Sequence, residues 1–124
     1  MEYIYYVVLA ILLFFLLRGF LPIKGVNNIS TTELKTELNK KHKQFIDVRT
    51  PVEFKRKHIK SFKNIPLDQL AQRATKEISK EKEVIVICQS GMRSKQASKI
   101  LKKSGCAKVT NVRGGMLAWQ GNEK

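Results

Sequence analysis

The feature that most constrains the fold of this chain is a run of β-branched residues that ends in a cysteine. Residues 83–87 read Glu-Val-Ile-Val-Ile, and Cys88 follows directly. An unbroken run of this kind predicts a buried strand. Six residues, Gln-Ser-Gly-Met-Arg-Ser at 89–94, separate Cys88 from a segment with helical spacing that continues to Leu101. The sequence therefore predicts a thiol held between the end of a buried strand and the beginning of a helix.

That position predicts a nucleophile at Cys88. The first turn of a helix offers free backbone N–H groups and the positive end of the helix dipole. Such a cradle binds anions and favours a thiolate. Gly91 permits a tight turn, and Arg93 adds a positive charge. A lone cysteine after an apolar strand is commonly a packed core residue, but the glycine, arginine and serines that follow favour the nucleophile.

The rest of the chain alternates between strand-like and helix-like segments. Extended segments are expected over 44–48, 59–65, 83–87 and 109–112. Helices are expected from the capping box at 30–33, from Pro51, over 67–78, after the loop at 89–94, and after Gly114-Gly115. Alternation of this kind indicates an α/β domain with a largely parallel sheet.

The N-terminal segment predicts a membrane anchor over residues 1–21. Every residue from Tyr3 to Leu17 is apolar or tyrosine, and the apolar run resumes after Arg18 as far as Leu21. A transmembrane helix needs about 20 such residues. A cleaved signal peptide is the alternative, but Glu2 and the absence of a small-residue cleavage site disfavour it. We accordingly predict an anchor at 1–21, a linker at 22–29 and a folded domain at 30–124.

Charge predicts the orientation and the surroundings of the domain. Arg18 and Lys24 follow the apolar run and no basic residue precedes it, so the positive-inside rule places the domain in the cytoplasm of a single-pass membrane protein. The chain has 24 Lys and Arg against 10 Asp and Glu, a net charge of +14. We expect this charge to draw the domain toward anionic lipid. Nucleic acid is not an expected partner, because no basic motif interleaved with aromatic residues is present.

Several short motifs, taken together, resemble those of one family. In order they are Phe45-Ile46-Asp47-Val48-Arg49-Thr50, Glu53-Phe54, His58-Ile59, Asn64-Ile65-Pro66-Leu67, the stretch from Cys88 to Ser94, and Val112-Arg113-Gly114-Gly115 with Trp119. The chain from Ile29 to Gln120 is similar to a single-domain rhodanese, of the sulfurtransferase family. The resemblance implies a rhodanese-like three-layer α/β domain with a central, largely parallel sheet, here preceded by one transmembrane helix. The family's usual glycine and small residue are replaced by Ser61-Phe62, so we expect Phe62 to reshape the wall near the active loop.

The length of the cysteine loop distinguishes two chemistries within this fold. Cys88 to Arg93 is Cys-x4-Arg, whereas the phosphatases and arsenate reductases of the same fold have a Cys-x5-Arg loop that is wide enough for a tetrahedral oxyanion. The shorter loop resembles that of the sulfurtransferases, which closes around a single additional sulfur. A phosphatase or arsenate reductase, and a non-catalytic module that recruits a partner to the membrane, remain as alternative functions.

The resemblance implies a ping-pong transfer of sulfane sulfur. Cys88 takes the sulfur from thiosulfate or a protein persulfide and passes it to a thiol or to cyanide. The expected substrate-binding residues form the loop: Gln89, Ser90, Gly91, Met92, Arg93 and Ser94. Their backbone N–H groups would stabilise the persulfide anion, and the two serines would add hydroxyl donors. No metal and no organic cofactor is implied.

Five further residues outside this loop have alternative roles. Asp47 and Arg49, together with Glu53, are expected to form a structural polar cluster rather than an acid–base pair. His58 is expected to be structural, with a Cys–His dyad as the alternative. Cys106 is expected to be a packed thiol, with a resolving cysteine as the alternative.

Overall fold

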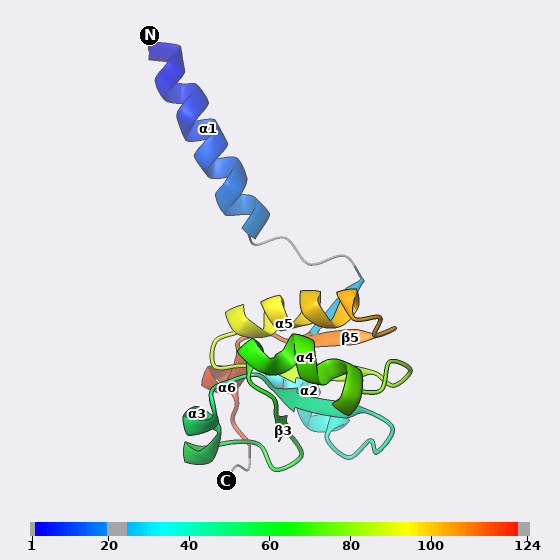
Figure 1. Ribbon diagram of the computed structural model, residues 1–124. Helices are drawn as coiled ribbons and strands as arrows, with labels where there is room; N and C mark the ends of the chain where they lie inside the picture. The colour runs from blue at the N-terminus through cyan, green and yellow to red at the C-terminus, as the bar shows by residue number, and fades with distance from the viewer. Residues whose placement is uncertain (1, 20–24, 122–124) are drawn as a thin grey trace.

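The computed structural model describes residues 2–19 and 25–121 (Figure 1). Helix α1 (Glu2–Gly19) stands apart from an α/β domain that holds the other elements. The strands of the domain are β1 (Val26–Ile29), β2 (Gln44–Asp47), β3 (Lys63–Asn64), β4 (Val84–Ile87) and β5 (Val109–Val112). Its helices are α2 (Thr31–Glu37), α3 (Pro51–Arg56), α4 (Leu67–Glu77), α5 (Met92–Lys103) and α6 (Gly115–Ala118).

The five strands form one sheet in the order β1-β5-β4-β2-β3, and every pairing is parallel. The predicted parallel sheet is therefore confirmed. Strand β4 is central, and all four of its residues are buried, as its unbroken β-branched sequence indicates. Because parallel strands share one direction, the loops that follow β2, β4 and β5 meet at the same edge of the sheet. Ligand sites of open α/β sheets lie at this edge.

Two apolar clusters pack on the two faces of the sheet and make three layers. On one face, Val84 and Val86 of β4 contact residues of α4 and α5, including Leu70 and Leu101. On the other, Ile85 and Ile87 pack with Leu34 of α2 and with Met116 and Trp119 at α6. Alternate residues of β4 thus serve opposite clusters, as the pleat of a strand requires. The three-layer arrangement predicted above is confirmed.

The first turns of two helices are set by capping boxes. Ser30 accepts a hydrogen bond from the backbone N–H of Glu33 at the beginning of α2. At α3, Thr50 accepts one from the backbone N–H of Glu53, whose carboxylate accepts the Thr50 N–H in return. These reciprocal bonds satisfy backbone donors that a helix start leaves free. They also hold the Glu53 side chain at the edge of the sheet where the loops meet.

The predicted linker at 22–29 is wrong for its last four residues. Val26–Ile29 form β1, which pairs along its whole length with β5. Two asparagines at the centre of this strand, Asn27 and Asn28, remove the apolar pattern by which a strand is recognised in a sequence. Residues 22–24 lie outside the described residues.

The structure does not support the predicted transmembrane helix. Within the described part of the chain, no helix is both long enough and apolar enough to cross a bilayer. Helix α1 ends at Gly19, and its eighteen residues include the charged Glu2 and Arg18. The continuation to Leu21, on which the prediction depended, falls on residues that are not described.

Phe62 packs in the core and is not among the residues that line the pocket beside Arg93. Its side chain is buried in the second apolar cluster, and its ring contacts that of Phe45 edge to face, with centroids 5.4 Å apart. The bulky residue that replaces the usual small one therefore fills the core instead.

Candidate active site

Cys88 lies directly after β4, and α5 begins four residues later. The residue is fully buried. Its Sγ accepts a hydrogen bond from the backbone N–H of Gly91 at 2.9 Å. Gly91 is the N-cap of α5, so the sulfur lies at the positive end of a twelve-residue helix. The predicted placement of the thiol, between a buried strand and a helix N-terminus, is confirmed, and Gly91 provides one donor of the expected cradle.

Ser94 joins the thiol to a buried polar chain. The Cys88 thiol donates to Ser94 Oγ at 3.5 Å, and that hydroxyl donates to Asn111 Oδ1 at 2.5 Å. The Asn111 amide in turn donates to Asn28 Oδ1 at 3.0 Å. We expected the Ser94 hydroxyl to donate to the sulfur. In this geometry the hydroxyl instead has two other acceptors, Asn111 Oδ1 of β5 and the Gly91 carbonyl oxygen at 3.1 Å.

Arg93 is held in a bidentate ion pair with Glu53 of α3. Its two terminal nitrogens donate to the two carboxylate oxygens at 2.7 and 2.9 Å. The hydrogen bonds from Arg93 lower the pKa of Glu53 to about 2, and the carboxylate raises the pKa of Arg93. Planar bidentate pairs of this kind fix orientation as well as charge. The positive charge that the sequence places beside Cys88 is therefore already partnered.

Asp47 and Arg49 form the predicted structural cluster, with one change of membership. Both are buried, and Arg49 donates to both oxygens of Asp47 at 2.7 to 3.0 Å. Arg49 also donates to Gln89 Oε1 at 3.3 Å and to the carbonyl of Lys57 at 2.7 Å. The third member is therefore Gln89 of the loop, since Glu53 pairs with Arg93. The cluster fixes the first residue after Cys88.

Helix α6 holds the other side of the loop, a role that the sequence analysis missed. The backbone N–H groups of Met116 and Leu117 donate to the carbonyls of Cys88 and Gln89 at 2.8 and 3.0 Å. This approach requires glycine at 115, because a Cβ there would lie 2.3 Å from the Cys88 carbonyl oxygen. The pair Gly114-Gly115 was the available signal, since adjacent glycines mark a close backbone approach.

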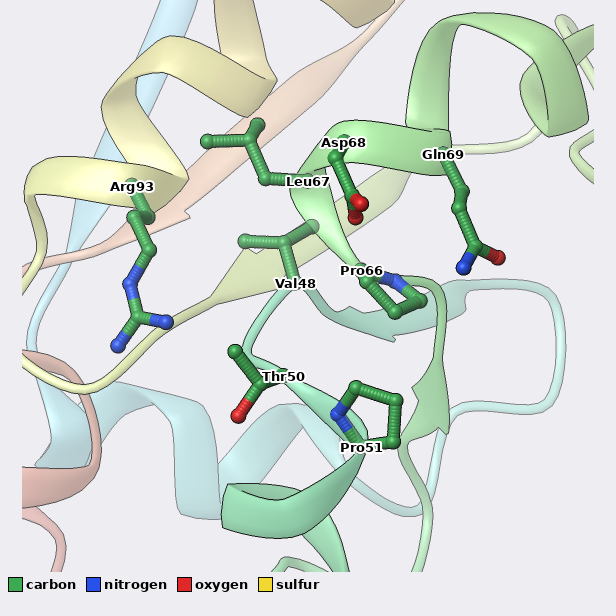
Figure 2. Close-up of a pocket in the computed structure, with 8 residues that line it drawn as sticks. All are labelled: Val48, Thr50, Pro51, Pro66, Leu67, Asp68, Gln69 and Arg93. Carbon is green, nitrogen blue, oxygen red and sulfur yellow. The ribbon is translucent and has the colours of Figure 1, made fainter.

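A pocket of about 370 Å³ lies beside Arg93, between the beginnings of α3 and α4. Val48, Thr50 and Pro51 line one side, and residues 66–69 line the other. Figure 2 shows the Arg93 side chain reaching down beside Thr50. The lining is largely apolar near Val48 and Leu67 and polar at Asp68 and Gln69. A molecule that approaches the loop from this side meets Arg93.

The remaining predicted residues differ in their surroundings. Ser90 and Met92 are exposed. His58 is structural, as expected: its Nδ1 lies 2.7 Å from the Phe54 carbonyl oxygen, and its ring stacks on that of Phe54. Cys106 is a packed thiol, buried in the same apolar cluster as Cys88. In the described residues, no group of three or more His, Cys, Asp and Glu side chains is arranged to hold a metal ion.

Comparison with known proteins identifies the architecture. The family model of the rhodanese-like domain matches residues 30–122 of this chain. The protein YqhL of Bacillus subtilis is 46% identical over 81 residues, which cover 65% of this chain and 64% of that one. A sulfurtransferase of Allochromatium vinosum is 35% identical to this chain over 95 residues. The matched region covers 76% of this chain and 88% of the A. vinosum protein. The crystal structure of a rhodanese-like domain protein from Staphylococcus aureus has a TM-score of 0.69 at 34% identity, covering 76% of this chain and 91% of its own.

The matches differ in how much of each relative they include. This chain spans slightly less than two thirds of YqhL but most of the A. vinosum and S. aureus proteins. What they share with this chain is the domain that contains the Cys88 loop.

Proposed function

We propose, since this chain belongs to the rhodanese-like domain family, that it is a sulfurtransferase that carries sulfane sulfur on Cys88. The observation that carries the proposal is the 2.9 Å hydrogen bond from the Gly91 N–H to Cys88 Sγ, inside a short loop that opens helix α5. A sulfur in this position lies where a negative charge is stabilised. The A. vinosum relative, which is named a sulfurtransferase, supports the same activity.

The first half-reaction loads the enzyme. The Cys88 thiolate attacks the outer sulfur of thiosulfate, a new S–S bond forms, and the bond to the sulfonate sulfur breaks. Sulfite leaves with the electron pair of that bond, so no external oxidant or reductant is needed. The enzyme then holds a persulfide, Cys88–S–S⁻. A protein persulfide donates in the same way and leaves as a thiolate.

The second half-reaction empties the enzyme. A thiolate or cyanide attacks the outer sulfur of the persulfide, and the Cys88 thiolate leaves. The N–H of Gly91 and the dipole of α5 lie at Sγ, where the restored thiolate carries its charge. The outer sulfur would extend beyond the buried Cys88 side chain toward the acceptor. This extension would allow a buried thiol to deliver sulfur to a molecule outside.

A non-catalytic rhodanese-like module is the second candidate. The complete burial of Cys88 favours it, because a nucleophile must be reached by its substrate. The partnered Arg93 favours it as well, since the guanidinium of the loop is already bonded to Glu53. Against it stand the N–H on Sγ and the contacts that fix the loop from α3, α6 and β5, because a binding module does not need a cradled thiol. The physiological donor, the acceptor and the cytoplasmic, membrane-bound location stay predictions.

Intact mass measurement tests the proposal directly. The reduced full-length protein is incubated with thiosulfate, next to the Cys88→Ala variant, and cyanide is then added. We expect the mass of one sulfur to be gained by the wild type alone and to be lost again as thiocyanate. If neither thiosulfate nor a protein persulfide loads the wild type, the sulfurtransferase proposal is wrong and the binding module takes its place.

A further inference from the structure

The large apolar side chains that the domain exposes are gathered at its active loop. Among residues 25–121, three large apolar residues are exposed: Val52, Met92 and Leu117, with 66%, 77% and 71% of their surface accessible. Single exposed apolar residues are common on any surface. Three that surround one loop, with the other large apolar residues of the described domain buried or half-buried, indicate a contact surface.

The structure connects each of the three to the loop of Cys88. Val52 precedes Glu53, which is bonded to Arg93 at 2.7 Å. Met92 precedes Arg93 in the chain and begins α5. The backbone N–H of Leu117 donates to the Gln89 carbonyl at 3.0 Å. In Figure 1, α3, α6 and the beginning of α5 lie at the same end of the domain.

We propose that Val52, Met92 and Leu117, which we call the apolar rim, form the docking surface for a protein that donates or accepts the sulfur. The partner's reactive thiol lies on an acidic segment and is flanked by apolar side chains. This inference rests on the proposed function, because it identifies the class of molecule with which the Cys88 persulfide reacts. A thiol on a protein surface is thereby preferred to a small thiol.

Charge around the rim indicates the acidic partner. Lys55 and Arg56 follow Val52 by three and four residues on the short helix α3, so they share its face. Both are exposed, as is Arg113, which precedes the Gly114-Gly115 pair beside the loop. The carboxylate of Glu53 is taken by Arg93. The exposed acid nearby is Asp68, across the pocket from α3. The rim is therefore apolar at its centre and mainly positive around it.

The pocket beside Arg93 can bind one of the partner's apolar side chains. Val48, Pro51 and Leu67 line it, and Pro51 is the neighbour of Val52 in the rim (Figure 2). A free small thiol would gain nothing from this pocket or from the rim. A protein segment would bury both and would bring its thiol to the buried Cys88 in a fixed orientation.

Synthetic acceptor peptides test the docking surface. The full-length protein is loaded with sulfur from thiosulfate and then mixed with peptides that have one central cysteine. In the first peptide the cysteine is flanked by Leu and Glu, in the second by Leu and Lys, and in the third by Ser and Glu. Persulfide on the peptide is measured by mass, and cyanide serves as the acceptor that needs no docking. We expect the first peptide to react at least about tenfold faster than either of the others.

Variants of the rim locate the effect. The double variant Val52→Ser/Leu117→Ser should lose about tenfold in transfer to the first peptide, while its transfer to cyanide stays within about twofold of the wild-type rate. The charge variant Lys55→Glu/Arg56→Glu should lose a similar factor. Its matched control, Lys80→Glu/Lys103→Glu, makes the same change in net charge at exposed residues near the C-terminal end of α5 and should lose little.

The outcomes separate the docking surface from the activity. If all three peptides react at the same rate, or if the rim variant transfers to the first peptide as fast as the wild type does, the docking proposal is wrong and sulfur transfer stands. If both charge variants lose equally, general attraction explains the preference and the docking proposal is again wrong. If neither thiosulfate nor a protein persulfide loads the wild type and cyanide releases no thiocyanate, the proposed function itself fails and the docking proposal with it.

Discussion

The two cysteines of this protein lie beyond opposite ends of the same helix. Cys88 precedes α5, and Cys106 follows it. Both are buried, with 0% and 3% of their surface exposed, and both belong to the same apolar cluster. Burial therefore does not distinguish them. Their positions relative to the helix do, because the positive end of the helix dipole is at Cys88 and the negative end is at Cys106.

The polar contacts of the two thiols differ accordingly. Cys88 Sγ receives the N–H of Gly91 and contacts the hydroxyl of Ser94. At Cys106 the backbone N–H, rather than the thiol, makes the hydrogen bond: it donates to the Leu101 carbonyl at the C-terminal end of α5. Burial raises the pKa of the Cys106 thiol, although the positive charges of Lys80 and Lys102 oppose the rise. The two thiols of one cluster therefore differ in their surroundings. Polar groups contact the Cys88 sulfur, whereas burial raises the pKa of the Cys106 thiol.

Removal of each thiol should give the largest contrast. Cys88→Ala should reduce thiocyanate production by at least about a thousandfold, because the atom that carries sulfur is lost. Cys106→Ala should retain activity within about twofold and lose about 1 kcal/mol of stability, since a small buried side chain is removed. Initial rates with thiosulfate and cyanide and denaturant midpoints measure both. A large loss of activity in Cys106→Ala would instead indicate a resolving cysteine.

Substitution of one glycine near each cysteine tests the same difference between the two ends of α5. Gly115→Ala should reduce activity at least about tenfold, because its Cβ would lie 2.3 Å from the Cys88 carbonyl oxygen and would push α6 off the loop. Gly105→Ala, next to Cys106, is the matched control. Its φ of 99° makes alanine cost about 1 kcal/mol, but it is remote from the loop and should leave the rate unchanged. Equal losses of activity would contradict the role given to α6.

The ion pair at the reactive end should respond to pH. The pKa of Glu53 is lowered from 4.5 to about 2 by the hydrogen bonds from Arg93. A carboxyl whose pKa is lower in the folded state contributes stability above its unfolded pKa, and that contribution is lost as pH falls through the folded value. The difference in unfolding free energy between the wild type and Glu53→Gln should therefore shrink between pH 4.5 and about 2. Denaturation curves across this pH range measure the difference in unfolding free energy. A difference that does not change with pH would contradict a stabilising ion pair between Glu53 and Arg93.

The same variant should change the affinity for an anionic donor. Glu53→Gln leaves Arg93 without its carboxylate, so the KM for thiosulfate should fall by about two- to fivefold while kcat changes little. Asp68→Asn removes a carboxylate on the other side of the pocket and is the matched control. A KM that rises in Glu53→Gln would show that the pair is needed to position the loop rather than to restrain the arginine.

The smallest effect is expected at the packed thiol. In Cys88→Ala, Cys106 is the remaining cysteine, and its thiolate absorbance should reach half of its maximum above the usual pKa of 9.0. Unfolding in denaturant should bring the midpoint back toward that value, because the desolvation that raises it is removed. A midpoint that is the same in the folded and unfolded states would show that burial at this end of α5 has no electrostatic consequence.

Local patterns in the sequence predicted the elements on which the site is built. The run at 83–87, the capping box at Ser30, the helix that begins at Pro51 and the helix after the loop at 89–94 were all predicted and are present. Strand β1 was missed because its two central asparagines interrupt the apolar pattern of a strand. Its extended conformation depends on pairing with β5, which is distant in the sequence. The apolar run before Arg18 predicted an anchor by length, and no helix among the described residues is long and apolar enough to cross a bilayer.

The sequence by itself determined that a thiol follows a buried strand and precedes a helix, because strand, loop and helix are adjacent in the chain and each has a local signature. Only the tertiary structure decided what surrounds that thiol. Glu53, Arg49 and Asn111 lie 17 to 40 residues from the loop residues they bond, and the parallel sheet brings them together at one edge. Contacts between residues so far apart depend on which strands are neighbours, and strand order is set by the packing of the whole sheet rather than by any local pattern.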